Sequence, residues 1–267
     1  MTVLKPNGHK ICKEWLSEDP IQALSLEWMQ GEVHISQGTE AVIRVTQRGS
    51  ALFPRTRCFE AKISNGVLHL IDGRKQAFPV GINFHRTSLH IVLPPTVLQR
   101  LLINGVGSRF VVDNVSSEHW DCQCTSGNLT LSGHAQHIRL QSVGGRVTAT
   151  DLRANHIQLK ATSSPIQLSG QFSHIQSRVT GSKLSINSST MLLSLDSRST
   201  GCNVEVRIPP DKDGFKLDFK QAGGRFSSDF PLHSNHNQHT YRNGMYPFQA
   251  EVRGGKLTIG SYLLHTT

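Results

Sequence analysis

The chain has 267 residues, of which 37% are hydrophobic and only 6% aromatic, a lean supply for a conventional globular core. Its 23 glycines, together with many Ser, Thr and Asn residues, favour turns and short strands. The formal net charge of +9, with 14 histidines besides, favours anionic partners but carries no information about fold.

Other bulk features exclude several classes of protein. No stretch approaches about 18 consecutive apolar residues, so no membrane-spanning helix is predicted. The first residues lack the apolar core of a signal peptide, which predicts a location inside the cell, with peripheral association with the envelope as an alternative. The five cysteines show neither CxxC spacing nor the pattern of a disulfide framework.

The N-terminal third shows irregular strand patterns. Residues 1–20 are expected to form a cap or a frayed segment, with a short helix over Lys13 to Ser17. Residues 21–100 are expected to form the irregular β N-terminal part of the fold, because apolar residues alternate at Leu24, Leu26 and Trp28 and again in residues 88–94. Pro94 and Pro95 close this part.

Residues 101–262 contain an internal repeat, with an insertion at about residues 230–246. A corner of small residues is followed by a strand, and this unit recurs eight times. The first apolar residues of these units are Phe110, Leu129, Val147, Ile166, Leu184, Val204, Phe226 and Leu257. They are 19, 18, 19, 18, 20, 22 and 31 residues apart. Five consecutive steps near 19 indicate a structural repeat.

The repeat predicts an all-β fold, a parallel β-solenoid or β-helix with coils of about 19 residues. A unit of this length cannot bury its own hydrophobic face, whereas stacked units bury a continuous column of aliphatic side chains. Glycine and serine at the corner allow positive φ angles and a close approach between coils. An antiparallel β-sandwich with regularly spaced strands is the alternative.

The order of these segments resembles the DUF4097 family, a bacterial group of adhesin-like β-solenoid repeat proteins with envelope-stress-associated relatives in Gram-positive bacteria. The resemblance rests on an opening strand pair (residues 24–45), a strand that ends in proline before the repeats (residues 88–108), and two closing segments (residues 208–232 and 241–262). It covers roughly residues 20–262 and implies a β-solenoid fold with no assigned catalytic residues.

Basic residues recur at one position of the repeat. They directly precede the first apolar residue of five units: Arg109, Arg146, Lys183, Arg225 and Lys256. Strand alternation turns these side chains outward, so a discontinuous cationic stripe is expected along one edge. The stripe is a candidate anion-binding surface, and a generic solvated face is the alternative.

Two groups of histidines stand out. His137, His156 and His174 each directly precede an isoleucine, so they are expected to stack as a ladder that marks one exposed position in three coils. A strip that binds metal or anions is the functional alternative. His233, His236 and His239 lie in the insertion, where a polar surface segment is expected; no metal site is predicted.

The sequence favours a non-enzymatic binding or scaffold protein that presents a basic, repetitive surface to an anionic envelope polymer or a protein partner. Acidic residues between positions 104 and 200 share no row in neighbouring coils, and no nucleophile or phosphate-binding motif is present. The alternative is a carbohydrate-active β-helix enzyme acting on an acidic polysaccharide. No cofactor is predicted, nucleic acid is disfavoured because only three Trp and three Tyr are available for stacking, and the oligomeric state stays open.

Overall fold

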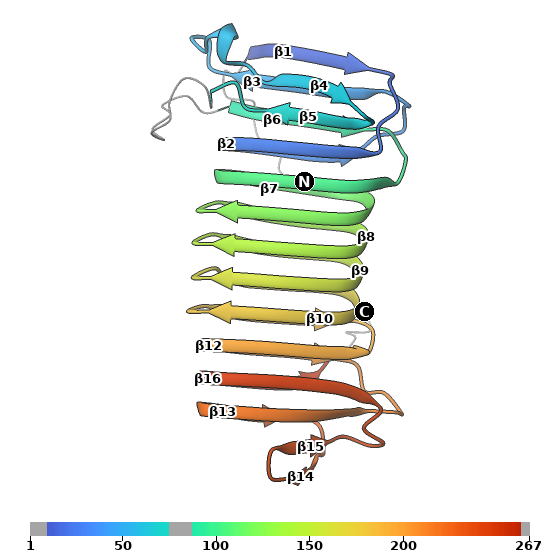
Figure 1. Ribbon diagram of the computed structural model, residues 1–267, viewed down its shortest axis with the longest axis vertical. Helices are drawn as coiled ribbons and strands as arrows, with labels where there is room; N and C mark the ends of the chain where they lie inside the picture. Colours follow the sequence, from blue (N-terminus) through green and yellow to red (C-terminus); the bar gives the residue numbers. More distant parts are fainter. Residues whose placement is uncertain (1–9, 75–86, 263–267) are drawn as a thin grey trace, which may run out of the picture.

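The computed structural model describes residues 10–74 and 87–262, and these residues form strands almost throughout (Figure 1). One 3-10 helix, η1, spans Arg55–Arg57. The strands are β1 (Lys10–Ser17), β2 (Ala23–Gln37), β3 (Ile43–Gly49), β4 (Glu60–Ser64), β5 (Val67–Ile71), β6 (Thr87–Leu93), β7 (Leu98–Thr125), β8 (Asn128–Val143), β9 (Arg146–Thr162), β10 (Ile166–Thr180), β11 (Lys183–Ser188), β12 (Ser194–Ile208), β13 (Phe215–Ser228), β14 (His233–Asn235), β15 (Gln238–Thr240) and β16 (Tyr246–Ser261).

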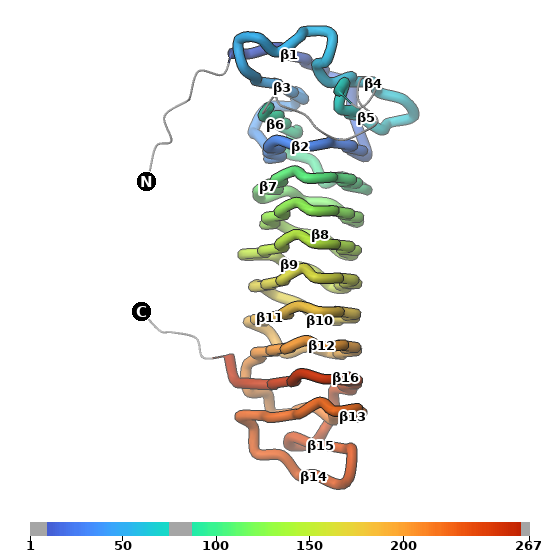
Figure 2. The backbone as a smooth tube through the Cα atoms, turned by 90° about the vertical axis from the view of Figure 1, so that its left-hand side faces the viewer, coloured from blue at the N-terminus to red at the C-terminus, as the bar shows by residue number. Residues whose placement is uncertain are grey.

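The strands join into one 16-stranded sheet with the order β1-β3-β6-β2-β7-β8-β9-β10-β11-β12-β16-β13-β15-β14, from which β4 and β5 branch beside β2. From β2 and β7 through β12, β16 and β13, successive layers pair in parallel. The long strands bend back within each layer, so the molecule is a narrow column of stacked coils (Figures 1 and 2). This confirms the predicted parallel β-solenoid and excludes the antiparallel sandwich.

Stacking in register builds the core. The first apolar residue of each repeat lies beside its counterpart, as in the pairs Phe110 with Leu129 and Val147 with Ile166. These side chains are at most 2% exposed from Phe110 through Leu257, and Phe226 in the last layer is partly buried. Each coil contributes only a few aliphatic side chains, which explains how a chain with 6% aromatic residues fills its interior.

The corners of the coils adopt the left-handed conformation. One residue in each layer from β2–β7 to β13 has φ between 50° and 70°: Gly107, Ser126, Gly144, Ser163, Gly181, Gly201, Gly254 and Gly223. At four of these corners the backbone N–H donates to a carbonyl of the next coil, for example Gly144 to Thr162 at 3.0 Å. The corners therefore turn the chain and continue the hydrogen-bond ladder between coils.

One expectation about the N-terminal end of the solenoid is wrong. Lys13 to Ser17 belong to β1, because this segment pairs antiparallel with β3 and extends the sheet rather than forming a helix. At the C-terminal end the strands do not stack in chain order, since β16 lies between β12 and β13 and pairs in parallel with both. Residues 1–9 of the expected cap and residues 75–86 lie outside the described residues.

The N-terminal end is closed by antiparallel strands and a buried ion pair. β6, β3 and β1 follow β2 outward, while the β4–β5 hairpin packs beside β2 (Figure 2). Asp72 accepts a hydrogen bond from Arg74 Nε at 2.7 Å and from the Met29 backbone at 3.1 Å. The guanidinium of Arg74 also donates to the carbonyl of Gln30 at 2.8 Å and lies 5.3 Å from the Trp28 ring. This network ties the segment after β5 to the first coil.

The close approach between coils predicts different effects of alanine at two neighbouring glycines. Gly254 and Gly255 both have positive φ, but a Cβ on Gly254 would meet nothing within 4 Å, whereas one on Gly255 would lie 2.0 Å from the Cys202 carbonyl oxygen. We expect Gly254→Ala to cost about 1 kcal/mol in unfolding free energy through its backbone conformation. Gly255→Ala should cost a further ~1–3 kcal/mol from overpacking. Urea denaturation measures the unfolding free energy of both variants. Equal losses of unfolding free energy would contradict the prediction that the close approach of Cys202 restricts the size of the side chain at position 255.

Candidate functional site

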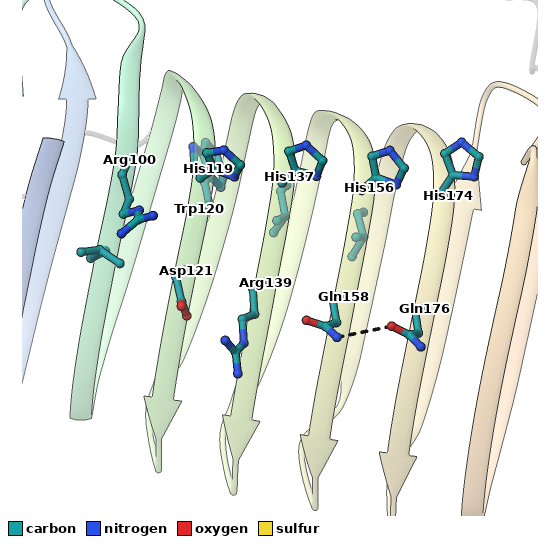
Figure 3. Close-up of a pocket in the computed structure, with 13 residues that line it drawn as sticks. Arg100, His119, Trp120, Asp121, His137, Arg139, His156, Gln158, His174 and Gln176 are labelled. Atoms are coloured by element: carbon teal, nitrogen blue, oxygen red, sulfur yellow. Dashed lines mark hydrogen bonds between the residues drawn. The ribbon is translucent and has the colours of Figure 1, made fainter. Parts of the chain in front are cut away.

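A ladder of four parallel imidazoles runs across β7, β8, β9 and β10 (Figure 3). The structure places the predicted His137, His156 and His174 side by side, and it adds His119 at the start. Successive ring centroids are 4.9, 4.9 and 4.6 Å apart and the rings are tilted by only 8–11°. We call these four residues the histidine ladder.

The alternation of side chains along each strand explains why the ladder faces outward. Each ladder histidine directly precedes an inward-facing residue of the core, namely Trp120, Ile138, Ile157 or Ile175. Since neighbouring side chains on a strand point to opposite sides, the imidazoles face outward. The sequence pattern of histidine before isoleucine missed His119, because Trp120 occupies the isoleucine position there. The spacing of 18 residues between His119 and His137 is the signal that would have found it.

A second outward row lies two residues further along the same strands. It consists of Asp121, Arg139, Gln158 and Gln176, and the two glutamines are joined by a hydrogen bond of 3.3 Å (Figure 3). An open groove of about 420 Å³ lies between this row and the ladder, and Arg100 and Leu102 line its β7 end. We call it the ladder groove.

A third outward row is strongly basic. Gln141, Lys160, Arg178 and Arg198 occupy one position in consecutive layers. A smaller hollow of about 140 Å³ separates this row from the second one. Arg198 lies 3.8 Å from Asp196, whereas Lys160 and Arg178 form no ion pair within the described residues. The face that carries the ladder is therefore basic even when its histidines are neutral.

Stacking affects the protonation of the ladder. The pKa of His156 is lowered, first because partial burial disfavours the charged imidazolium and second because His174 and His137 lie on either side. His174 is held at the open end of the ladder by Ser194, whose Oγ lies 2.8 Å from its Nδ1. The stack therefore opposes protonation of His156 in particular.

The geometry of the ladder does not suit a metal ion shared by adjacent rings. Zn–N bonds of about 2.0–2.1 Å require two ligating nitrogens to lie within about 4.2 Å of each other. Parallel rings 4.6–4.9 Å apart keep equivalent nitrogens beyond that limit. Over residues 10–74 and 87–262 no group of three or more His, Cys, Asp or Glu residues has an arrangement that could hold a metal.

The five stripe residues also lie in register, on another edge of the coils. The row reads Glu32, Arg109, Asn128, Arg146, Pro165, Lys183, Asn203, Lys256 and Arg225. All five basic side chains are exposed. Two of them meet acids, since Arg109 lies 3.4 Å from Glu32 and Lys183 lies 3.5 Å from Glu205. We call this row the cationic stripe.

The stripe borders a hollow of about 270 Å³ between Arg146 and Lys183. Asn and Pro separate the basic residues from β7 to β12, so their charges recur at every second coil there. At the far end Lys256 and Arg225 are direct neighbours. The stripe is therefore sparser in charge than the third row of the ladder face.

The histidines of the insertion do not converge. His233 and His239 lie on β14 and β15, which form a hairpin, and His236 lies in its turn with φ of 53°. His239 accepts or donates a hydrogen bond with Ser234 at 2.8 Å and packs its ring 4.8 Å from that of Phe226. The hairpin thus packs on the last layer of the solenoid.

Two free cysteines of β7, Cys122 and Cys124, are core residues. Cys122 and Cys124 are buried, and burial raises the pKa of both thiols, so neither is a reactive thiolate. Cys122 lies beside Leu140 of the next coil, in a row of buried apolar side chains.

These features define a β-solenoid that displays outward rows of identical or similar side chains. The chain belongs to the Toastrack DUF4097 family, whose model matches residues 21–253. Membership confirms the resemblance seen in the sequence. The part of the chain that the structure describes contains no helix long and apolar enough to cross a membrane.

Two solved structures from Parabacteroides distasonis share the fold. A candidate adhesin is 12% identical with a TM-score of 0.61, and the match covers 94% of this chain and 97% of that one. A candidate lipid-binding protein is also 12% identical with a TM-score of 0.60, and the match covers 96% of this chain and 97% of that one. Among curated proteins, none matches this sequence.

The lowered pKa of His156 predicts that acid destabilises the fold. The folded protein binds fewer protons there than the unfolded chain, so stability is constant well above the unfolded pKa of about 6.5 and declines as pH falls through it. His90 and His239 act in the same direction, since burial lowers both pKa values. We expect the melting temperature to fall between about pH 7.5 and about pH 5.

The variant His156→Gln should reduce this fall, whereas His236→Gln, which changes an exposed histidine of the hairpin turn, should leave it unchanged. Thermal unfolding across this pH range measures the effect. A wild-type pH dependence in His156→Gln would exclude the ladder as a source of acid sensitivity.

Proposed function

We propose that this protein is a non-enzymatic, multivalent binding protein that presents its stacked coils to an anionic polymer, such as the acidic polymers of a cell envelope, from a peripheral position. The observation that supports this most is the register of the cationic stripe, where basic side chains take the same outward position in every second layer from β7 to β12 and in both β16 and β13. A polymer that runs along the solenoid would meet these charges repeatedly, and many weak contacts add up to useful affinity.

Other observations favour binding over catalysis. Hydrolysis of a glycosidic bond needs two carboxylates on either side of the scissile bond. The acids of the regular coils are dispersed: Asp121 and Asp196 share one outward row, but three coils separate them. One structural relative is described as a candidate adhesin and another as a candidate lipid-binding protein, and both descriptions concern binding.

The test is retention on a heparin resin as a function of salt. Arg146→Ala combined with Lys183→Ala removes the two basic residues that border the stripe hollow. We expect this variant to elute at lower salt than the wild type, because each lost contact reduces the number of counterions released on binding. The salt dependence of the dissociation constant should be correspondingly shallower.

The matched control is Arg153→Ala combined with Lys212→Ala, which removes the same charge from exposed positions outside the stripe. Elution of this control at the wild-type salt concentration would assign the effect to the stripe rather than to net charge. Identical elution of both variants would refute the stripe, and release of shortened heparin or polygalacturonate chains would refute the non-enzymatic assignment.

A further inference from the structure

The ladder groove is unexplained by the cationic stripe. It lies on a different face of the coils, and its imidazoles are exposed or partly exposed although the packing of the core requires nothing of them. Four aligned histidines, rather than one or two, suggest that their common property is used. That property is an imidazole ring, which forms hydrogen bonds and can take up a proton.

We propose that the ladder groove is a second binding site for acidic polysaccharide, which it takes up when the histidine ladder is protonated. The inference rests on the proposed function for the class of ligand, but it concerns different residues and adds regulation by pH. The acidic groups of the polymer lie along the coil axis against the ladder, and its hydroxyls face the amides of Gln158 and Gln176 (Figure 3).

The shape of the site suits a linear polymer. The groove crosses five consecutive coils, from Arg100 through the four ladder histidines to Gln176, and is open along its length. The ladder repeats every 4.6–4.9 Å, so a chain running across the coils meets one imidazole per step. Because all these side chains stand on paired strands, little conformational entropy is lost when the ligand binds.

The net charge of the ladder groove depends mainly on whether the histidines are protonated. Inside the groove, Arg100 and Arg139 are opposed by Asp121. Four added protons would therefore multiply a small positive charge several-fold. The remaining charged or titratable neighbours of the ladder on β7, β8, β9 and β12 and in the adjoining basic row are Glu118, His134, Arg153, Lys160, Arg178, Asp196 and Arg198.

Protonation and binding are coupled through the stack. In the free protein, partial burial disfavours the charged form of His156, and His174 and His137 on either side disfavour it further. Anionic groups placed along the ladder favour the charged form, so the bound protein holds more protons than the free one. By linkage, affinity must then rise as pH falls.

The test uses a heparin oligosaccharide, because its sulfate groups stay ionised and any pH dependence comes from the protein. Fluorescence anisotropy at constant ionic strength gives the dissociation constant at about pH 7.5 and about pH 5.5. The measurement is made on Arg146→Ala/Lys183→Ala protein, which lacks the two stripe residues that border the stripe hollow. We expect binding to be about tenfold tighter at the lower pH, which corresponds to an average uptake of about half a proton on binding across these two pH units.

His137→Gln combined with His156→Gln, added to the same protein, should reduce this gain to twofold or less. The matched control His233→Gln/His236→Gln removes two exposed histidines of the β14–β15 hairpin and should keep the full gain. Circular dichroism at both pH values confirms that each variant is folded. A direct readout is the NMR titration of the His156 ring, whose pKa should rise when heparin is added.

The outcomes separate the two sites. If the ladder variant still binds heparin more tightly at the lower pH, or if heparin does not raise the pKa of His156, the ladder site is overturned and the proposal for the stripe is unaffected. A gain that depends on the ladder, in a protein whose neutral-pH binding is insensitive to Arg146→Ala/Lys183→Ala, supports the ladder and overturns the stripe. Absence of binding at both pH values, with the stripe intact, overturns both.

Discussion

Backbone hydrogen bonds between parallel strands hold each residue of a coil beside the residue at the same position of the next coil. Every other feature of the molecule depends on this register. Inward positions become columns of aliphatic side chains, and outward positions become rows. A residue type that recurs every 18–20 positions in the sequence therefore becomes a row several coils long on the surface. Such a row requires only that each coil stack on its neighbours.

The same register forces similar charges together. Lys160, Arg178 and Arg198 are neighbours in consecutive coils, and only Arg198 has an acid close by. Such contacts would destabilise a surface designed for stability alone, although water and salt screen them. In the proposals made above, the cationic stripe and the ladder face, which carries both a basic row and the stacked imidazoles, recognise an anionic polymer.

The sequence predicted what the repeat period determines. The core row from Phe110 to Leu257, the left-handed corners and the alignment of His137, His156 and His174 all follow from residue spacing, and the structure shows each of them. His119 was missed because the pattern demanded isoleucine where Trp120 stands. The ladder groove could not be predicted, since it depends on how two neighbouring outward rows are spaced and on the side-chain conformations of Arg139 and Gln158.

The ends of the solenoid were the least predictable part. Whether a segment at the end of a stack forms a strand depends on which strand it pairs with. The local sequence of Lys13 to Ser17 suggested a short helix, whereas its pairing with β3 makes it a strand. The steps of 22 and 31 residues around β13 and β16 showed that the repeat had become irregular, but local patterns carry no information about strand order.

The position of β16 between β12 and β13 has a consequence for the order of events during synthesis. β12 and β13 leave the ribosome before the strand that must separate them, and each pairs with β16 along nearly its whole length. The growing chain can stack its coils one by one as far as β12. β13 and its hairpin reach their place in the stack only after β16, which ends at Ser261, has been synthesised. At this end the order of strands in space therefore differs from the order of their synthesis.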